Sequence, residues 1–303
     1  MDLYLPIANL SVNALVIVAL GLGVGLLSGM FGVGGGFLTT PLLIFYGIPP
    51  TVAAASAASQ VTGASVSGVF AHVRRKGVDF HIGGVMVAGG VIGAGAGAWL
   101  FEILRANGLI DTVIAVLYVL LLGSIGGLML KESVDARRVH KGARPPARRR
   151  RHHPLVAALP LRWRFYRSGL YISPLAPLLL GFATGVLTML LGVGGGFILV
   201  PAMLYLLGMS TQVVVGTSLF QILFVTGAAT MVHAVTTKAV DIVLAVLLLL
   251  GSVAGAQIGA RLAQKLRPDQ LRMVLAALVL LVAIRMALGL GWRPGEIYSV
   301  EPA

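Results

Sequence analysis

The sequence predicts an all-α polytopic membrane protein with two inverted repeats of about five hydrophobic segments each, and with broken or re-entrant helices at two glycine motifs. Three observations lead to this prediction: a low charge, long apolar runs and an internal duplication. Of the 303 residues, 57% are hydrophobic and 11% are charged, whereas soluble domains carry about a quarter charged residues. The mean hydropathy is +0.95, so most of the surface is expected to face lipid.

The apolar runs have the length and the pattern of membrane helices. Residues 113–130 and 242–259 contain no charged side chain, and a helix needs about 20 apolar residues to cross a bilayer. Lipid offers no hydrogen-bond partners to the backbone, so only helices or closed barrels can span it. Because the runs are continuous rather than alternating, they favour helices.

The duplication is clearest in a glycine-rich motif. Residues 32–37 and residues 192–197 both read Gly-Val-Gly-Gly-Gly-Phe, and each copy is followed by a proline, Pro41 or Pro201. With slips of one or two residues in register, further pairs match in the same order, namely Ser56 with Thr217, Gln60 with Gln221, His72 with His233 and Asp79 with Asp241. Such ordered matches indicate a repeat architecture.

Each half contains five hydrophobic segments. They are expected at 12–31, 35–47, 52–73, 80–101 and 110–130 in the first half, and at 173–191, 197–208, 212–233, 241–262 and 270–291 in the second. The second segment of each half reaches only roughly 18 Å, against a hydrocarbon core of about 30 Å. The first two segments therefore form a broken or re-entrant pair, or cross at the limit of their length, and either way each half makes an odd number of crossings.

An odd number of crossings predicts that the halves are inverted, and the charges of the loops agree. Residues 74–76 are all basic, whereas the matching residues 235–238 contain one lysine. The next loop reverses this bias, because residues 102–110 contain one base and residues 261–272 contain four. Since basic residues concentrate on the cytoplasmic side of membranes, the two halves are expected to have opposite orientations.

The predicted organisation follows from these comparisons: residues 1–130 form the first membrane repeat, 131–171 a basic cytoplasmic linker, 172–292 the second membrane repeat and 293–303 a C-terminal tail. The linker carries most of the net charge of +13. We interpret it as a cytoplasmic loop that contacts anionic lipid, in preference to a nucleic-acid-binding arm. Both termini are then external, in a bacterial-type cell membrane.

The glycine motifs are the predicted binding site for an anion. Inverted-repeat transporters bind substrate near the midplane, at discontinuous helices in matching positions. Successive glycines turn backbone N–H groups toward one point, and the following half-helix adds its positive N-terminal end. We predict substrate binding by Gly32, Gly34, Gly35, Gly36, Ser56, Ser59, Gln60, Gly192, Gly194, Gly195, Gly196, Thr217, Ser218 and Gln221. The alternative is that the glycines and small residues serve close helix packing.

Ionisable residues near the ends of segments have simpler candidate roles. His72 and His233 end the third segments and are candidates for gates or a proton relay, with solvation at the interface as the alternative. Asp79 and Asp241 begin the fourth segments and are expected to cap those helices. Arg285, the only base well inside a span, snorkels or pairs with a partner.

Several chemistries lack support in the sequence. The chain has no cysteine, no histidine or carboxylate cluster typical of a metal site and no phosphate-binding loop. No cofactor or metal is expected. Two alternatives to transport remain: an intramembrane enzyme that uses Ser67 and His72, and a membrane scaffold that uses the basic linker.

The motifs at residues 27–37 and 187–197 resemble those of the TauE/SafE sulfite exporter family. The downstream Ser/Ala/Gln stretches and the duplicated architecture are also similar to that family. The resemblance implies a secondary transporter that exports sulfite, other sulfur oxyanions or organosulfonates by alternating access, rather than an enzyme. The expected partners are a small anionic substrate and the lipid bilayer, with no nucleic acid, and a homo-oligomer is compatible with this reading. Transport of another small organic anion is the alternative.

Overall fold

The computed structural model describes residues 2–31, 34–74, 76–139, 163–165, 168, 170–263 and 268–291. The first half forms α1 (Ala14–Phe31), α2 (Gly36–Phe45), α3 (Pro50–Arg74), α4 (Phe80–Ala106) and α5 (Ile110–Val139). The second forms α7 (Leu175–Leu191), α8 (Gly196–Tyr205), α9 (Thr211–Val232), a π-helical turn η1 (His233–Thr237), α10 (Ile242–Ala263) and α11 (Pro268–Gly291). All ten predicted segments are helices, and the predicted all-α membrane fold is confirmed.

The helices have the surface of a membrane protein. Within the described residues, five helical stretches are long and apolar enough to cross a bilayer, at 80–106, 110–131, 213–237, 242–259 and 273–290. Large apolar side chains such as Trp99, Ile242 and Leu281 are exposed on the outside of the bundle, as lipid-facing residues are. The 25-residue α3 is less apolar, because its small and polar residues face other helices.

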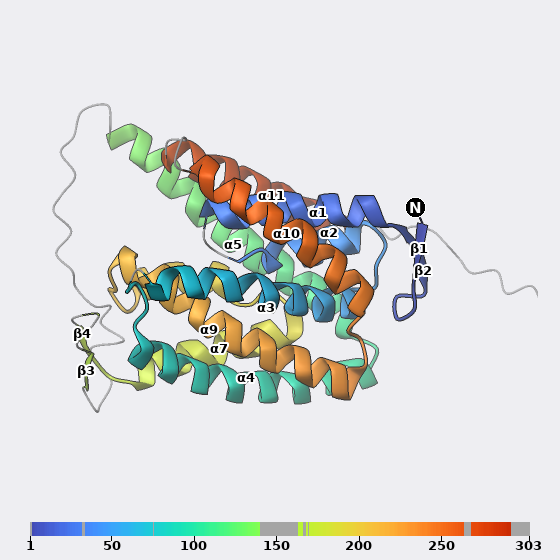
Figure 1. Cartoon of the computed structure of the whole chain (residues 1–303), viewed down its shortest axis with the longest axis horizontal. Helices are drawn as coiled ribbons and strands as arrows, with labels where there is room; N and C mark the ends of the chain where they lie inside the picture. The colour runs from blue at the N-terminus through green and yellow to red at the C-terminus, as the bar shows by residue number, and fades with distance from the viewer. Residues whose placement is uncertain are drawn as a thin grey trace, which may run out of the picture.

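Helices from different halves pack in equivalent pairs, α1 against α10 and α4 against α7 (Figure 1). Glycines bring the backbones of each pair into contact: a Cβ atom added to Gly93 would lie 2.1 Å from the Phe182 carbonyl oxygen, and one added to Gly255 would lie 2.1 Å from that of Leu22. Small residues at such crossings are typical of membrane helices. Close glycine contacts occur in both pairs, so the duplication extends to tertiary structure.

The equivalent helices α3 and α9 run antiparallel to each other. The Ser59 hydroxyl lies 3.4 Å from that of Thr230, and the Thr62 hydroxyl lies 2.8 Å from that of Thr226. Residue numbers therefore increase along α3 in the direction in which they decrease along α9. Inverted repeats require this relationship, whereas parallel repeats would place equivalent helices parallel. The orientation of the halves across a membrane stays a prediction.

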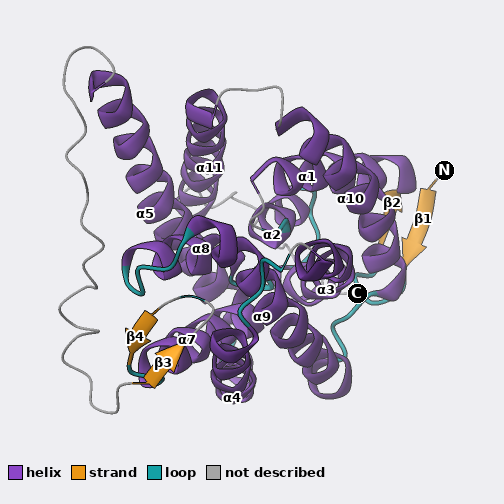
Figure 2. Ribbon diagram, turned by 60° about the vertical axis from the view of Figure 1, so that its left-hand side comes forward, coloured by secondary structure: helices purple, strands orange, loops and turns teal. Residues whose placement is uncertain are grey.

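Two β-hairpins precede the helices of the two halves, and the sequence analysis did not predict them. The first pairs β1 (Asp2–Leu5) with β2 (Leu10–Asn13), and the second pairs β3 (Trp163–Phe165) with β4 (Leu170–Ile172). The second hairpin falls almost entirely within the stretch 131–171 that was predicted to be a linker, and its last residue, Ile172, begins the predicted second repeat. The hairpins lie at opposite ends of the molecule in both views (Figures 1 and 2), as two-fold related elements do.

In the first half, the chain turns back between α1 and α2 rather than continuing as one kinked helix. The Asn13 N–H donates to the Tyr46 hydroxyl at 3.3 Å, so the residue before α1 contacts the residue after α2. Helix α2 therefore turns back toward the start of α1, and its 10 residues extend only about 15 Å. This is the re-entrant arrangement that the short second segment allowed.

Asp79 and Asp241 cap the fourth helix of each half, as the sequence predicted. The Asp79 carboxylate accepts hydrogen bonds from the N–H groups of His81 at 3.0 Å and Ile82 at 3.3 Å. The Asp241 carboxylate accepts one from the N–H of Leu244 at 3.1 Å. Both aspartates are buried, and these bonds satisfy backbone donors that a helix leaves unpaired at its start.

Candidate functional site

Glycines with positive φ angles interrupt the first helix of each half. In the first half Gly34 has φ +77°, and in the second half Gly192, Gly194 and Gly195 have φ +69°, +72° and +74°. Residues with a Cβ atom rarely adopt these angles. Gly32, which was predicted to bind substrate, lies outside the described residues.

The two glycine breaks meet in the middle of the protein. The rings of Phe37 and Phe197 stack with centroids 4.3 Å apart and an angle of 4° between their planes. A Cβ atom added to Gly36 would lie 2.7 Å from the Gly192 carbonyl oxygen. The structure thus brings together the two motifs that the sequence singled out.

The half-helices α2 and α8 begin at this meeting point. Their N-cap residues are Gly35 and Gly195, and among the described residues no side chain caps either helix. Gly36 and Gly196, the first helical residues, are buried. The N–H groups at a helix start need partners and carry a partial positive charge. Two such ends that are buried and uncapped are suited to hold an anion.

Gln60 and Gln221 lie beside the breaks, with relative exposures of 1% and 0%. Among the described side chains, their two Oε1 atoms are the buried polar atoms without a hydrogen-bond partner. An unpaired buried polar group costs about 1–3 kcal/mol, so native proteins keep few of them. The sequence analysis selected both residues because they occupy equivalent positions, and the structure gives them the same unusual environment.

Thr184 is a residue of the site that the sequence analysis missed. The Gln221 Nε2 donates to the Thr184 hydroxyl at 3.3 Å, and a Cβ atom added to Gly195 would lie 3.1 Å from the Thr184 Cβ. In the first half the same place is taken by Val24, whose Cγ1 lies 2.7 Å from a Cβ added to Gly35. The available signal was the presence of two threonines, Thr184 and Thr188, within the apolar run 175–191.

Two of the predicted hydroxyl residues make equivalent contacts between the halves. The Asp79 N–H donates to the Thr217 hydroxyl at 2.9 Å, and the Asp241 N–H donates to the Ser56 hydroxyl at 3.2 Å. These bonds fasten the third helix of each half to the start of the fourth helix of the other. Their role in substrate binding stays a prediction.

The other two predicted hydroxyls bond to their own helices. Ser59 donates to the Ala55 carbonyl at 3.2 Å and lies near Thr230, and Ser218 donates to the Val215 carbonyl at 2.9 Å. Such back-bonding satisfies a hydroxyl inside an apolar bundle. Both residues therefore have local partners, and a role for them with substrate also stays a prediction.

The two candidate gate histidines occupy different environments. His233 is fully buried; its Nε2 lies 2.9 Å from the Met189 carbonyl oxygen and its Nδ1 lies 3.2 Å from the Thr237 hydroxyl. His72 is partly buried, and its Nδ1 lies 2.9 Å from the carbonyl oxygen of its own-helix Gly68. His233 thus connects η1 with the last turn of α7, directly before the glycine break.

Other side chains also bind the end of α7. The Leu191 carbonyl accepts hydrogen bonds from the Tyr118 hydroxyl at 2.6 Å and from the Thr40 hydroxyl at 3.1 Å. Together with His233, they satisfy carbonyl groups that a helix leaves unpaired at its end. The break in the second half is therefore held by α2, α5 and η1.

The sequence analysis also considered Arg285, a metal site and Ser67. Arg285 is exposed and lies over the ring of Phe45, 5.1 Å from the ring centre, which is a cation–π contact. Within the described residues no three His, Asp or Glu side chains form a group that could hold a metal ion. The side chain of Ser67, the nucleophile of the enzyme alternative, lies outside the described set.

Comparison with known proteins places these features in a family. The model of the family described as "Sulfite exporter TauE/SafE" matches residues 17–286. Among relatives, the probable membrane transporter protein YjnA of Bacillus subtilis is 29% identical over 273 residues, which cover 89% of this chain and 98% of the relative. YunE of the same organism, with the same description, is 25% identical over 280 residues, or 89% and 96% of the two chains. A probable membrane transporter protein of Xylella fastidiosa is 28% identical over 274 residues, or 88% and 93%. No solved structure matches the chain.

Proposed function

This chain belongs to the TauE/SafE sulfite exporter family, and on that premise we propose that it is a secondary transporter that exports sulfite, a related sulfur oxyanion or an organosulfonate by alternating access. That the chain is a multi-pass membrane transporter follows from the family and from its apolar helices. The substrate class and the mechanism are our proposal. The observation that carries it is the meeting of two buried, uncapped helix starts at the Phe37–Phe197 contact.

The site offers neutral donors rather than fixed charges. The N–H groups at Gly36 and Gly196 supply donors with the added field of each half-helix. The amides of Gln60 and Gln221 supply two further N–H₂ groups, since rotation about the last torsion angle exchanges the oxygen and nitrogen positions. These donors carry no full positive charge. An oxyanion that they bind can therefore leave without the separation of an ion pair.

Alternating access suits the packing of this site. Gly192–Phe197 are all buried, so substrate needs a conformational change to reach the glycine motif of the second half. Helices of the two halves pack against each other in equivalent pairs, and the equivalent helices α3 and α9 are antiparallel. Inverted-repeat transporters move one repeat or bundle against another around a fixed central site. An ion gradient or the membrane potential would drive the transport.

We further propose a cell-membrane location with both termini outside and residues 131–171 in the cytoplasm. The basic residues of that stretch would contact anionic lipid, and no nucleic acid is required. The charge bias of the paired loops supports this orientation. A homo-oligomer is compatible with the proposal.

The proposed function is tested by transport in proteoliposomes that contain the purified full chain. Vesicles are loaded with radiolabelled sulfite, thiosulfate, an alkylsulfonate or a carboxylate of similar size, and the efflux of each is compared with that from protein-free vesicles. We expect protein-dependent efflux of at least one sulfur oxyanion or sulfonate and none of the carboxylate. Efflux of the carboxylate alone would support a transporter of another organic anion, and no efflux of any anion would contradict the proposal.

A further inference from the structure

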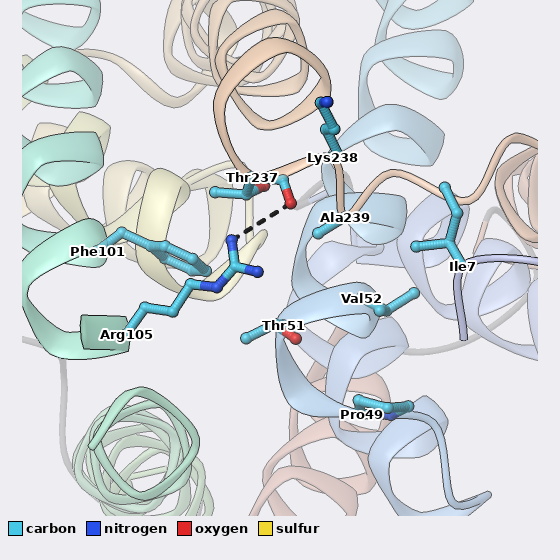
Figure 3. Close-up of a pocket in the computed structure, with 9 residues that line it drawn as sticks. All are labelled: Ile7, Pro49, Thr51, Val52, Phe101, Arg105, Thr237, Lys238 and Ala239. Atoms are coloured by element: carbon cyan, nitrogen blue, oxygen red, sulfur yellow. Dashed lines mark hydrogen bonds between the residues drawn. The ribbon is translucent and has the colours of Figure 1, made fainter. Parts of the chain in front are cut away.

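A cavity of about 360 Å³ lies at the end of the molecule near the turn of the first hairpin (Figure 3). Its volume falls in the range of small-ligand sites, about 300–1,000 Å³. It is lined by Ile7, Pro49, Thr51, Val52, Phe101, Arg105, Thr237, Lys238 and Ala239. These residues come from both halves, and none belongs to the glycine breaks, so the cavity is a separate feature.

The cavity is cationic. Arg105 and Lys238 line it, and none of the lining residues is acidic. The Asp241 carboxylate is fully buried and accepts a hydrogen bond from the N–H of the cavity residue Ile7 at 3.2 Å. Glu102, one turn before Arg105, is exposed and does not line the cavity. An anion that entered would therefore meet two positive charges.

The cavity brings together the single bases of two different loops. Residues 102–110 and 235–238 belong to the loops that are predicted to be external, and each contains a single base, Arg105 or Lys238. Both of these bases line one cavity. External loops carry few basic residues, and the fold places both of these at the same cavity, where they can act on one anion.

The two basic side chains of the cavity are oriented differently. Figure 3 shows the Arg105 guanidinium pointing toward Thr237 and Thr51, with Lys238 directed away from it. Arg105 Nη1 donates to the Thr237 carbonyl at 3.4 Å, and this long bond leaves most of the five guanidinium donors unused. The planar guanidinium matches two oxygens of an oxyanion, and the flexible lysine stem adds a mobile charge.

Contacts lead from the cavity to the break in the second half. Thr237, whose carbonyl receives Arg105, bonds through its hydroxyl to His233. His233 reaches the Met189 carbonyl at the end of α7 and packs against the cavity residue Phe101, with ring centres 5.2 Å apart. The π-helical geometry of residues 233–237 is of a kind found at functional sites.

We propose that this cavity is a vestibule in which Arg105 and Lys238 bind a small oxyanion on the external face, outside the central site. The inference rests on the proposed function for the identity of the ion, but the binding itself does not require transport. Two positive charges in a concave site raise the local concentration of anions.

The binding test measures the acylation of Lys238 by an N-hydroxysuccinimide ester, read by mass spectrometry on the full chain in phosphatidylcholine nanodiscs. Sulfate serves as the probe, because it is a sulfur oxyanion that does not consume the ester, and sodium chloride at the same ionic strength is the control. We expect sulfate to slow the acylation of Lys238 and to leave that of Lys131, an exposed residue within α5, unchanged. Arg105→Gln should raise the sulfate concentration needed for protection about tenfold, because a charged hydrogen bond is lost.

Three results would overturn the inference: equal protection of Lys131, protection of Lys238 in Arg105→Gln at the same sulfate concentration as in the wild type, or no protection by sulfate. A lipid phosphate offers the same oxyanion chemistry, so a second set of nanodiscs contains phosphatidylglycerol without sulfate. Protection of Lys238 by that lipid, without protection by sulfate, would also overturn the proposal that the cavity binds a free ion.

Transport separates this inference from the proposed function. In proteoliposomes, Arg105→Gln should raise the KM for sulfite about tenfold when sulfite is presented to the cavity face, whereas Lys131→Gln removes a charge elsewhere and should leave KM unchanged. If wild-type protein moves no anion but sulfate protects Lys238, the proposed function fails and the vestibule stands. If sulfite is transported but Lys238 is not protected, the vestibule fails and the proposed function stands.

Discussion

Phe37 and Phe197 stack face to face, with ring centres 4.3 Å apart and planes 4° apart. Each follows the last glycine of its motif, so the contact joins the two helix breaks of the duplicated chain. A residue and its own repeat equivalent can touch only near a two-fold axis that relates the halves. The axis therefore passes through the predicted anion site, beside Gln60 and Gln221.

The glycine crossing between α4 and α7 is expected to be intolerant of even one methyl group. Gly93→Ala places a Cβ atom 2.1 Å from the Phe182 carbonyl oxygen, so the helices must separate, and overpacking of this kind costs about 1–3 kcal/mol. Thermal unfolding in detergent measures the loss. The matched control is Gly95→Ala on the same helix, where no atom lies within 4 Å of the added group, and equal destabilisation by the two changes would refute the packing argument.

The inverted orientation can be tested by cysteine labelling, because the chain contains no cysteine. Lys76 and Lys238 are exposed, have φ angles of +56° and +49° and precede the capping aspartates Asp79 and Asp241 at equivalent positions. In intact cells, a membrane-impermeant maleimide should label Lys238→Cys, and should label Lys76→Cys only after permeabilisation. Labelling of both from the same side would rule out inverted halves.

Thr184 is expected to position Gln221. Thr184→Val removes the acceptor of the Gln221 amide, which should lower stability by about 1 kcal/mol and raise the KM for the transported anion. The control is Val24, its equivalent in the first half: Val24→Thr introduces a hydroxyl beside Gly35 and should not produce the loss of stability expected for Thr184→Val. An unchanged KM in Thr184→Val would exclude a positioning role.

Much of this structure followed from local patterns in the sequence. All ten helices overlap the predicted apolar segments, because a continuous apolar run in a membrane satisfies its backbone hydrogen bonds by forming a helix. Duplication also pointed to Gln60 and Gln221, whose environments proved equivalent. Asp79 and Asp241 cap helices as expected, since capping depends on residues close in sequence.

Features that depend on contacts between distant segments did not follow from the sequence. The strands of the hairpins have three or four residues, too few for a clear alternating pattern, and the second was hidden in a basic stretch. Thr184 gained its meaning only through Gln221, and the cavity joins Arg105 to Lys238 across the two halves. The residues of the π-helical turn after α9 show no sequence pattern that would have predicted it.

The most direct test of the central claim is the Gln60→Leu variant, studied by radiolabelled sulfite efflux and by thermal unfolding of the same preparation. The change replaces a buried amide whose oxygen lacks a partner with an apolar side chain of similar size, which should leave stability equal or raise it by up to about 1–3 kcal/mol. If Gln60 is retained to bind the anion, efflux should be lost although the protein is at least as stable as the wild type. Efflux at the wild-type rate from a stably folded Gln60→Leu protein would contradict the assignment of the site.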